Sequence, residues 1–392
     1  MGSKQDFREA QRAIVVVVAL MGLFGMAGPA ALAAPTISSA SGTASAGQQV
    51  IIRGSGFGAK PTPGPLVFDD FERGTNGALV AGNAPLVKNI SNNFTWRDFA
   101  TTSSGKPKYS NTVMRMSGAK SSYHGYGSGR GYNSSLEIIH PVQETGGEVY
   151  FSMWRYQKRT STNWSRNVKP WIVYGNGSGG VFPSAYNGWG NPSDGDGAFR
   201  NSVQDNGGSA PSATLWGGPD VSQIDGQWIR IEGYLKQSSS STNNGAFQVW
   251  VHRPNSISRV QSNTSYRTRT TDNYWRQWHF GSYYADDTGN AAGEVYLDEI
   301  YFDNTRARVE LGNTSTWETN THREIQIPTS WADGQVSVTI NPGTFTAGQT
   351  AYLFVVDANG VASNQGYPVV IEQGGTAAIS SPPNPPGSIE VR

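Results

Sequence analysis

Apolar and polar side chains alternate at every second residue through almost the whole chain, and this pattern limits its fold most strongly. The alternation is clear in segments such as "EVYFSMWRY", "WIRIEGYLK", "FQVWVH", "EVYLDEIYFD" and "AYLFVVD". Because successive side chains of a β-strand point to opposite faces of a sheet, a period of two predicts strands. Clusters of Gly, Asn, Ser and Pro, such as "QSSSSTNNG" and "DDTGNAAG", separate the segments as turns do. No segment after the first 33 residues carries a helical stripe, so we predict an all-β protein.

The first 33 residues have the pattern of an export signal. Three basic residues precede an apolar run over 13–26, and the small residues Ala31 and Ala33 precede Ala34. The alternative is an uncleaved membrane anchor, but Gly and Pro near the end of the run make it short for a membrane span. We therefore expect a secreted protein, either extracellular or held at the cell surface.

Composition narrows the class of ligand. The 392 residues include no cysteine, so disulfides cannot stabilise the exported chain. Lys and Arg number 30 against 29 Asp and Glu, and this balance gives no electrostatic reason to bind nucleic acid. The 12 Trp and 17 Tyr suit neutral polar ligands such as sugars, although a buried core also uses aromatic residues.

The stretch "PTISSASGTASAGQQVIIRGSGFG" that follows the signal resembles the start of a TIG (IPT) domain, an immunoglobulin-like sandwich. The later strands of such a domain are similar to "REIQIPTSWADGQVSVTINPGTF" and "AYLFVVDANGVAS", far along the chain. The resemblance implies one sandwich made of residues 35–66 and 306–372 and interrupted between them. The alternative is a single larger β-domain flanked by two unrelated pieces. Residues 373–392 are rich in Gly, Ser and Pro and read as a tail.

The interrupting segment, residues 67–305, is long enough for a complete jelly roll. Its order of strands, with "DGQWIRIEGYLK", a polar hairpin and "GAFQVWVHR", resembles the concanavalin A-like jelly rolls of polysaccharide lyases and carbohydrate-binding modules. The expected fold is therefore all-β: an immunoglobulin-like sandwich with an inserted concanavalin A-like jelly-roll sandwich.

Alternation in the hairpin predicts a ligand-binding face. Ile229, Ile231 and Leu235 fall on one side of their strand and are expected to face the core. In jelly rolls of this type the concave face binds glycan, by stacking of aromatic rings and by polar contacts. The opposite side of the hairpin collects residues suited to this: Arg230, Glu232, Tyr234, Lys236, Gln248, Trp250 and His252. Cross-strand pairs on an ordinary solvated sheet are the alternative.

A loop-rich, aromatic segment at 159–220 could form the rim of the same cleft. Within "NWSRNVKPWIVYGNGSGG", Lys169 and Trp171 are expected to reach the ligand. Long loops without secondary structure often carry function. The tryptophans of the segment could equally close one end of the sandwich.

Catalysis is the alternative to simple binding at this face. Lysis of a uronate polymer needs a group that neutralises the carboxylate, a base for the C5 proton and an acid for the leaving oxygen. Arg230, Tyr234 and His252 could fill these roles, and His279 is a further candidate. However, the Gln-Ile-His and Tyr-x-Lys-x-Gly-x-Tyr strands of the lyases are missing, and the carboxylates of "EVYLDEI" do not match a retaining glucanase. We therefore favour binding and leave catalysis open.

Carboxylates gather at both ends of the interrupting segment, in "FDDFERG" and "YLDEIYFDN". Hard oxygen ligands of this kind bind calcium, and adjoining strands would bring the two ends together. The residues predicted to hold a structural calcium ion are Asp69, Asp70, Glu72, Asp298 and Asp303. Their use as turn formers at strand ends is the alternative.

The sequence thus predicts an exported polysaccharide-binding or cell-surface protein that uses the concave face of a jelly roll. A polysaccharide lyase acting on uronic-acid polymers is one alternative. A self-assembling surface or filament subunit, which associates through the TIG-like sandwich and the tail, is another.

Overall fold

The structure is a computed structural model that describes the chain from residue 33 to residue 373 with internal gaps. The described residues are 33–115, 118–127, 129, 131, 133–142, 147–159, 169–176, 184–189, 199–204, 211–216, 218, 224–283 and 293–373. They form strands and two short 3-10 helices, Ser103–Gly105 and Trp317–Thr319, which confirms the all-β prediction. No helix among them is long and apolar enough to cross a membrane. The predicted export signal and tail lie almost entirely outside the described residues.

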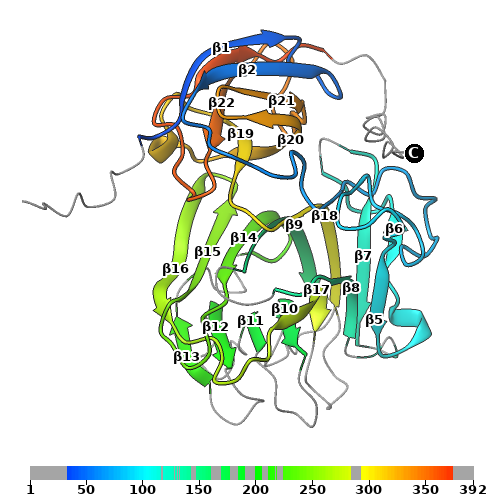
Figure 1. Ribbon diagram of the computed structural model, residues 1–392. Coiled ribbons are helices and arrows are strands. Elements are labelled where there is room, and N and C mark those ends of the chain that lie inside the picture. Colours follow the sequence, from blue (N-terminus) through cyan, green and yellow to red (C-terminus); the bar gives the residue numbers. More distant parts are fainter. Residues whose placement is uncertain are drawn as a thin grey trace, which may run out of the picture. The chain divides into compact units, whose positions relative to one another are not determined.

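The two ends of the described chain meet in one small sandwich, here called the terminal sandwich (Figure 1). Strand β20 joins its two sheets, because residues 323–326 pair with β19 and residues 327–332 pair with β21. The core between the sheets includes Val50, Ile52, Val338, Leu311 and Leu353. The strands follow the order β1 (Thr36–Gly42), β2 (Gln49–Ser55), β21 (Gln335–Thr339), β20 (Arg323–Ala332), β19 (Arg308–Gly312), β22 (Thr350–Val356) and β23 (Tyr367–Val370).

The pairing of β2 with β21 is what joins the distant parts of the sequence. Gln49 lies opposite Thr339 and Arg53 lies opposite Gln335 in an antiparallel ladder. Residues before 56 and after 307 therefore belong to one sandwich, while the strands between them belong to two other sheets.

The residues between these ends form a second, larger sandwich, here called the central sandwich, with two antiparallel sheets. The first, here called the β14 sheet, contains β3 (Val67–Asp69), β4 (Val87–Lys88), β6 (Lys108–Ser110), β7 (Ser121–Tyr126), β9 (Glu148–Arg159), β14 (Trp228–Lys236), β15 (Gly245–Arg253), β16 (Ser256–Tyr266) and β18 (Gly293–Asp303). The second, here called the β17 sheet, contains β5 (Arg97–Ala100), β8 (Asn133–Ile139), β10 (Lys169–Gly175), β11 (Ser184–Trp189), β12 (Phe199–Gln204), β13 (Pro211–Trp216) and β17 (Trp275–Tyr283).

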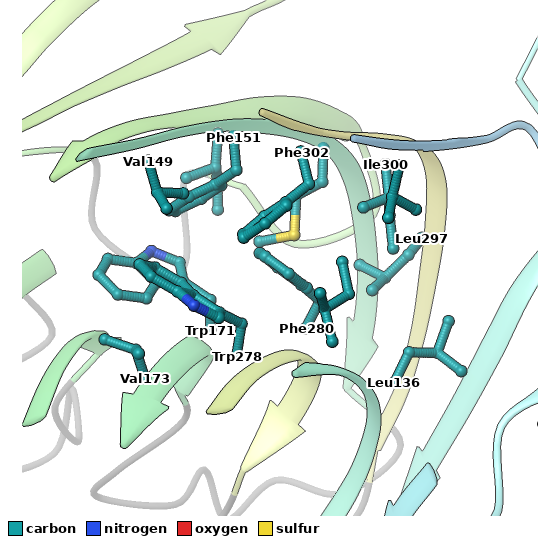
Figure 2. Packing of buried hydrophobic residues seen from close by; sticks show 14 of the residues in the cluster. Leu136, Val149, Phe151, Trp171, Val173, Trp278, Phe280, Leu297, Ile300 and Phe302 are labelled. Atoms are coloured by element: carbon teal, nitrogen blue, oxygen red, sulfur yellow. The ribbon is translucent and has the colours of Figure 1, made fainter. Parts of the chain in front are cut away.

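The alternating apolar residues of both sheets meet in one core, as sandwich packing requires. Figure 2 shows Phe151, Phe302 and Phe280 packed together, with Trp171 and Trp278 nearby. Phe280 lies 5.3 Å from Phe151 and 6.2 Å from Phe302 between ring centroids, in edge-to-face geometry. The core fixes which side chains point outward, because the neighbours of each core residue along a strand must face away.

Candidate functional site

The hairpin β14–β15 forms as predicted, and the structure gives its register. Arg230 lies opposite His252, Glu232 opposite Trp250 and Tyr234 opposite Gln248. The alternate residues Ile229, Ile231 and Leu235 are buried in the central core, as expected. The predicted polar face therefore exists.

The expectation that this face is an open binding surface needs correction. Arg230, Glu232 and His252 are each at most 1% exposed, and strands β19 and β20 of the terminal sandwich supply partners to Arg230 and Glu232. Trp250 packs on an apolar cluster that includes Ile325 and Ile327 of β20. The polar face of the hairpin is therefore a contact between the two sandwiches. The alternation along the hairpin could not predict this contact, because the covering strands lie far away in the sequence.

A buried ionic group, here called the junction cluster, fills this contact. Its members are Tyr150, Arg230, Glu232, His252, Arg308, Glu310 and Arg323. Arg230 donates to Glu310 (3.0 Å) and to the carbonyl of Arg323 (3.0 Å). Arg308 donates from Nε to Glu310 (2.6 Å), and the Tyr150 hydroxyl donates to Glu232 (2.8 Å).

The arginines keep the carboxylates of the junction cluster ionised. Burial raises the pKa of Glu310, but the attraction of Arg230 and Arg308 outweighs it and lowers the pKa to about 2. For Glu232, burial is likewise outweighed by Arg230 and His252, which hold its pKa well below the usual range. Burial is the largest effect on His252 and lowers its pKa to about 4, in spite of Glu232. The cluster is therefore a set of paired charges closed to solvent.

The remaining predicted ligand residues lie in different places. Trp171 is 1% exposed and packs in the central core against Phe151 and Phe247, so its ring does not face a ligand (Figure 2). Lys169 is also buried. Lys236 ends β14 and is half-buried. Most of the loop-rich segment 159–220 lies outside the described residues.

The carboxylates predicted to hold calcium are engaged by protein donors. Asp69 accepts from the Trp96 indole (2.6 Å), and Glu72 accepts from the backbone N–H groups of Ala119 (2.8 Å) and Lys120 (2.9 Å). Within the described parts of the chain, no group of three or more His, Asp or Glu side chains is placed to hold a metal ion.

The other three predicted calcium ligands are also buried or partly buried. Asp303 pairs with Lys60, and Asp70 accepts from the backbone of Glu72 (3.2 Å). Asp298 accepts from the backbone of Glu299 (2.8 Å). Burial is the largest cause of the raised pKa of both Asp70 and Asp298. A structural calcium ion remains a prediction, which melting curves with and without a chelator would test.

The outer face of the β17 sheet presents a different group, here called the histidine site: Arg97, Phe99, Glu137, Tyr174, Gln277 and His279. Strand register places it, because His279 of β17 lies opposite Glu137 of β8 and Ile172 of β10. Glu137 in turn lies opposite Arg97 of β5. The neighbours of His279 along β17, Trp278 and Phe280, point into the core.

Contacts within the histidine site centre on His279. Its Nε2 lies 3.9 Å from the Glu137 carboxylate, which also accepts from Gln277 (3.0 Å) and pairs with Arg97 (3.3 Å). The Phe99 and Tyr174 rings pack edge-on against the imidazole, at 4.8 and 5.4 Å between centroids. The side chain of Arg97 is 61% exposed and Phe99 is 41% exposed, so the site reaches the surface.

His279 is 1% exposed, and neither of its ring nitrogens has a hydrogen-bond partner among the described residues. Buried polar groups without a hydrogen-bond partner are uncommon in native proteins, so each one needs a structural or functional reason. Burial, and secondarily the positive charge of Arg97, lowers the pKa of His279 to about 4. The imidazole is therefore neutral near pH 7, with a lone pair that no described residue uses.

The backbone of β17 approaches β7 and β8 closely at Gly281, two residues after His279. Gly281 has a φ of 147°, and a Cβ added there would lie 2.4 Å from the Ser134 carbonyl oxygen and 2.8 Å from His124 Nδ1. Only glycine combines this backbone angle with so little space. It lets β17 lie against β7 and β8 next to His279.

Sequence reasoning named His279 as a further candidate but missed its neighbours. Alternation alone could have shown that Glu137 points outward, because it lies between the core residues Leu136 and Ile138. The pairing of Gln277 with Glu137, 140 residues apart in sequence, is not visible in either strand alone. In the sequence, the site is therefore indicated by two strands, one with an outward-facing His and the other with an outward-facing Glu.

Comparisons with known proteins give a fold-level likeness. No protein-family model matches the chain, and no curated protein matches it either. Solved structures similar to it include alginate lyase Aly36B in a complex with an alginate trisaccharide, at 14% identity and a TM-score of 0.42, covering 62% of this chain and 99% of that one.

Two further similar structures are also alginate lyases. The PL-14 enzyme from Aplysia kurodai has 11% identity and a TM-score of 0.39, covering 50% of this chain and 87% of its own. The enzyme vAL-1 from Chlorella virus has 12% identity and a TM-score of 0.36, with coverage of 53% and 89%. These values are too low to carry an activity across, so the function is argued from the residues of the histidine site.

Proposed function

We propose that this chain binds an acidic polysaccharide at the histidine site and cleaves it by β-elimination. The observation that carries the proposal is His279: a buried, neutral imidazole with both nitrogens unused among the described residues, beside a surface cation and an exposed aromatic ring. A neutral imidazole is the form that accepts a proton. The proposed polysaccharide site therefore lies on the β17 sheet of the central sandwich and not on the polar face of the hairpin β14–β15.

The site offers the groups that lysis of a uronate requires. The exposed guanidinium of Arg97 suits a uronate carboxylate, since Arg presents paired donors to planar anions. His279 would take the C5 proton once the exposed Phe99 ring that packs on it moves aside for the sugar, and the Tyr174 hydroxyl would give a proton to the leaving oxygen. The apolar ring of Phe99 would stack on a sugar face.

The test is elimination activity on alginate, pectin and glucuronan, followed through the absorbance of the unsaturated product. Replacement His279→Gln is expected to reduce the rate at least a hundredfold, the usual contribution of a general base being about 10²–10⁴-fold. His252→Gln, in the junction cluster, is the matched control and should retain activity once circular dichroism shows that it is folded. Equal loss in both variants, or no product from any uronate polymer, would overturn the lyase proposal.

Binding can be tested apart from cleavage. Retention of alginate by His279→Gln in affinity electrophoresis would support a polysaccharide site at the β17 sheet even without turnover. We also propose that the protein is exported and that the terminal sandwich is of the TIG type, as the sequence indicates. N-terminal sequencing of protein recovered from the medium, beginning at Ala34, would support export.

A further inference from the structure

Lys60 and Asp303 form a buried pair that the proposed function does not use. The side chains of both residues are fully buried, and Lys60 Nζ contacts Asp303 Oδ2 directly. Lys60 lies between β2 and β3, and Asp303 is the last residue of β18. The two residues are 243 positions apart, at the two places where the chain passes between the terminal and central sandwiches.

The hydrogen bonds of the pair suit a neutral amine better than an ammonium ion. An ammonium group has three donors. Among the described residues Lys60 Nζ has one hydrogen-bond partner, Asp303 Oδ2. A charged group buried with unused donors is costly, whereas a neutral amine beside a neutral acid is not.

Titration of the two groups points the same way. Burial is the largest effect on Lys60 and lowers its pKa, in spite of the attraction of Asp303. Burial is likewise the largest effect on Asp303 and raises its pKa to about 6, in spite of Lys60. Both shifts are toward the uncharged forms, which are the forms that can condense to an amide.

The oxygens of Asp303 are already bound by donors. The Tyr301 hydroxyl donates to Oδ2 (3.1 Å), and the backbone N–H of Asn304 donates to Oδ1 (2.8 Å). Donors aimed at a carboxyl group stabilise the negative charge that develops when a nucleophile attacks its carbon. On its other side Tyr301 packs in a buried cluster that includes Phe68, Ile325 and Ile327.

We propose that Lys60 and Asp303 become joined by an intramolecular amide bond. Lys60 Nζ attacks Cγ of the protonated Asp303 side chain, a C–N bond forms and one C–O bond breaks. The hydroxyl group of the acid leaves with one amine proton as a water molecule, so no oxidant or other reactant is needed. The product is a neutral amide that the same Tyr301 and Asn304 donors can hydrogen-bond.

Such a bond would cross-link both connections between the sandwiches. The chain has no cysteine, so a disulfide cannot provide this link. A cross-link that closes a loop of this length restricts the unfolded chain strongly, as long disulfide loops do. The inference is independent of the polysaccharide site.

The test is a tryptic digest of the full chain, analysed by mass spectrometry. Trypsin does not cut after Lys60, because proline follows it. The peptides that contain Lys60 and Asp303 are therefore 54–73 and 277–306, whether or not the amide bond forms. We expect one branched peptide whose mass is the sum of the two, less one water molecule, with fragment ions that place the link at Lys60 and Asp303. Finding only the two linear peptides would overturn the proposal.

Two variants and a chemical probe make the result specific. Lys60→Arg keeps a cation but not the amine nucleophile, and Asp303→Ala removes the acid, so both should give only linear peptides. Reductive methylation of the denatured wild-type chain should leave Lys60 unmodified while it dimethylates Lys106, a partly exposed lysine. A dimethylated Lys60 throughout the wild-type sample would also overturn the bond, and none of these readings depends on how well a variant folds.

Discussion

The chemistry of each histidine in this chain depends on which partners its ring has. His124 and His279 are equally buried, but His124 uses both nitrogens, at 3.0 Å from the Ser122 hydroxyl and 2.9 Å from the Ser134 carbonyl oxygen. His279 has aromatic neighbours and a carboxylate at 3.9 Å instead. The first ring is part of the scaffold, whereas the second has the unpartnered nitrogens on which the proposed function rests.

The titration of His279 gives a prediction that does not require activity. Its ring signals in an NMR titration should move with a midpoint near its pKa of about 4, below the ordinary histidine value of about 6.5. Arg97→Gln removes the positive charge that contributes to this shift and should raise the midpoint. A midpoint unchanged by the substitution would show that Arg97 does not act on the ring. If His279 is the base, the elimination rate should fall in acid at the same pH and shift with it.

Stacking by Phe99 gives a second prediction at this scale. Phe99→Ala should weaken alginate binding about fivefold, since an aromatic contact contributes about 1 kcal/mol. Val370→Ala is the control, because Val370 is an apolar residue 56% exposed in the terminal sandwich. Isothermal titration calorimetry of both variants with alginate measures this change in affinity. An equal loss of affinity in the two variants would exclude specific stacking on Phe99.

At the scale of elements, the two faces of β14 show how one strand serves two contacts. Its apolar side packs in the central core, while its polar side meets β19 and β20 through Arg230 and Glu232. Paired and hydrogen-bonded charges are tolerated in such a buried place, but a single unpaired charge is not. The junction cluster should therefore favour one arrangement of these strands.

Removing one charge of the junction cluster tests this. Glu310→Gln leaves Arg230, Arg308 and Arg323 without their shared carboxylate, and we expect a loss of about 3–5 kcal/mol in the free energy of unfolding. Lys106→Ala breaks the more exposed pair with Asp98 (3.2 Å) and should cost less than about 1 kcal/mol. Chemical denaturation of both variants measures the difference. Similar losses would mean that the cluster contributes no more than a surface pair.

At the scale of the whole molecule, three buried histidines and the half-buried His140 link stability to pH. Burial is the largest cause of each lowered pKa, to about 3 for His124 and about 4 for His140, His252 and His279. Histidines of the unfolded chain take up protons below their ordinary pKa of about 6.5, whereas those of the folded chain do so only at lower pH. These groups therefore lower the free energy of unfolding as pH falls from 6.5 to about 4.

His140→Gln isolates one of these contributions. The wild type should lose stability relative to this variant between pH 6.5 and 4, and a constant difference across that window would contradict the expectation. The carboxyl groups of Asp69 and, in any chain without the proposed amide bond, Asp303 act in the opposite direction, because burial raises their pKa to about 7 and about 6. Comparing variant with wild type removes their effect, since both proteins carry them.

Local pattern predicted more of the fold than of the site. Alternation identified the strands of the hairpin and their inward residues. The resemblance of two distant segments to parts of one TIG domain predicted that β2 would meet strands beyond residue 323. Alternation also predicted correctly that Arg230, Glu232 and His252 share one face. It could not tell that this face is covered, because Glu310 and Arg323 come from another sheet far along the chain.

The sequence by itself determined the all-β class and which side of each strand is apolar, since these follow from the spacing of residues along one segment. Tertiary structure alone decided which polar face is buried, that Trp171 belongs to the core, and that Lys60 meets Asp303 across 243 residues. The physical reason is that burial and charge pairing depend on distance in space, whereas local pattern records only neighbours along the chain.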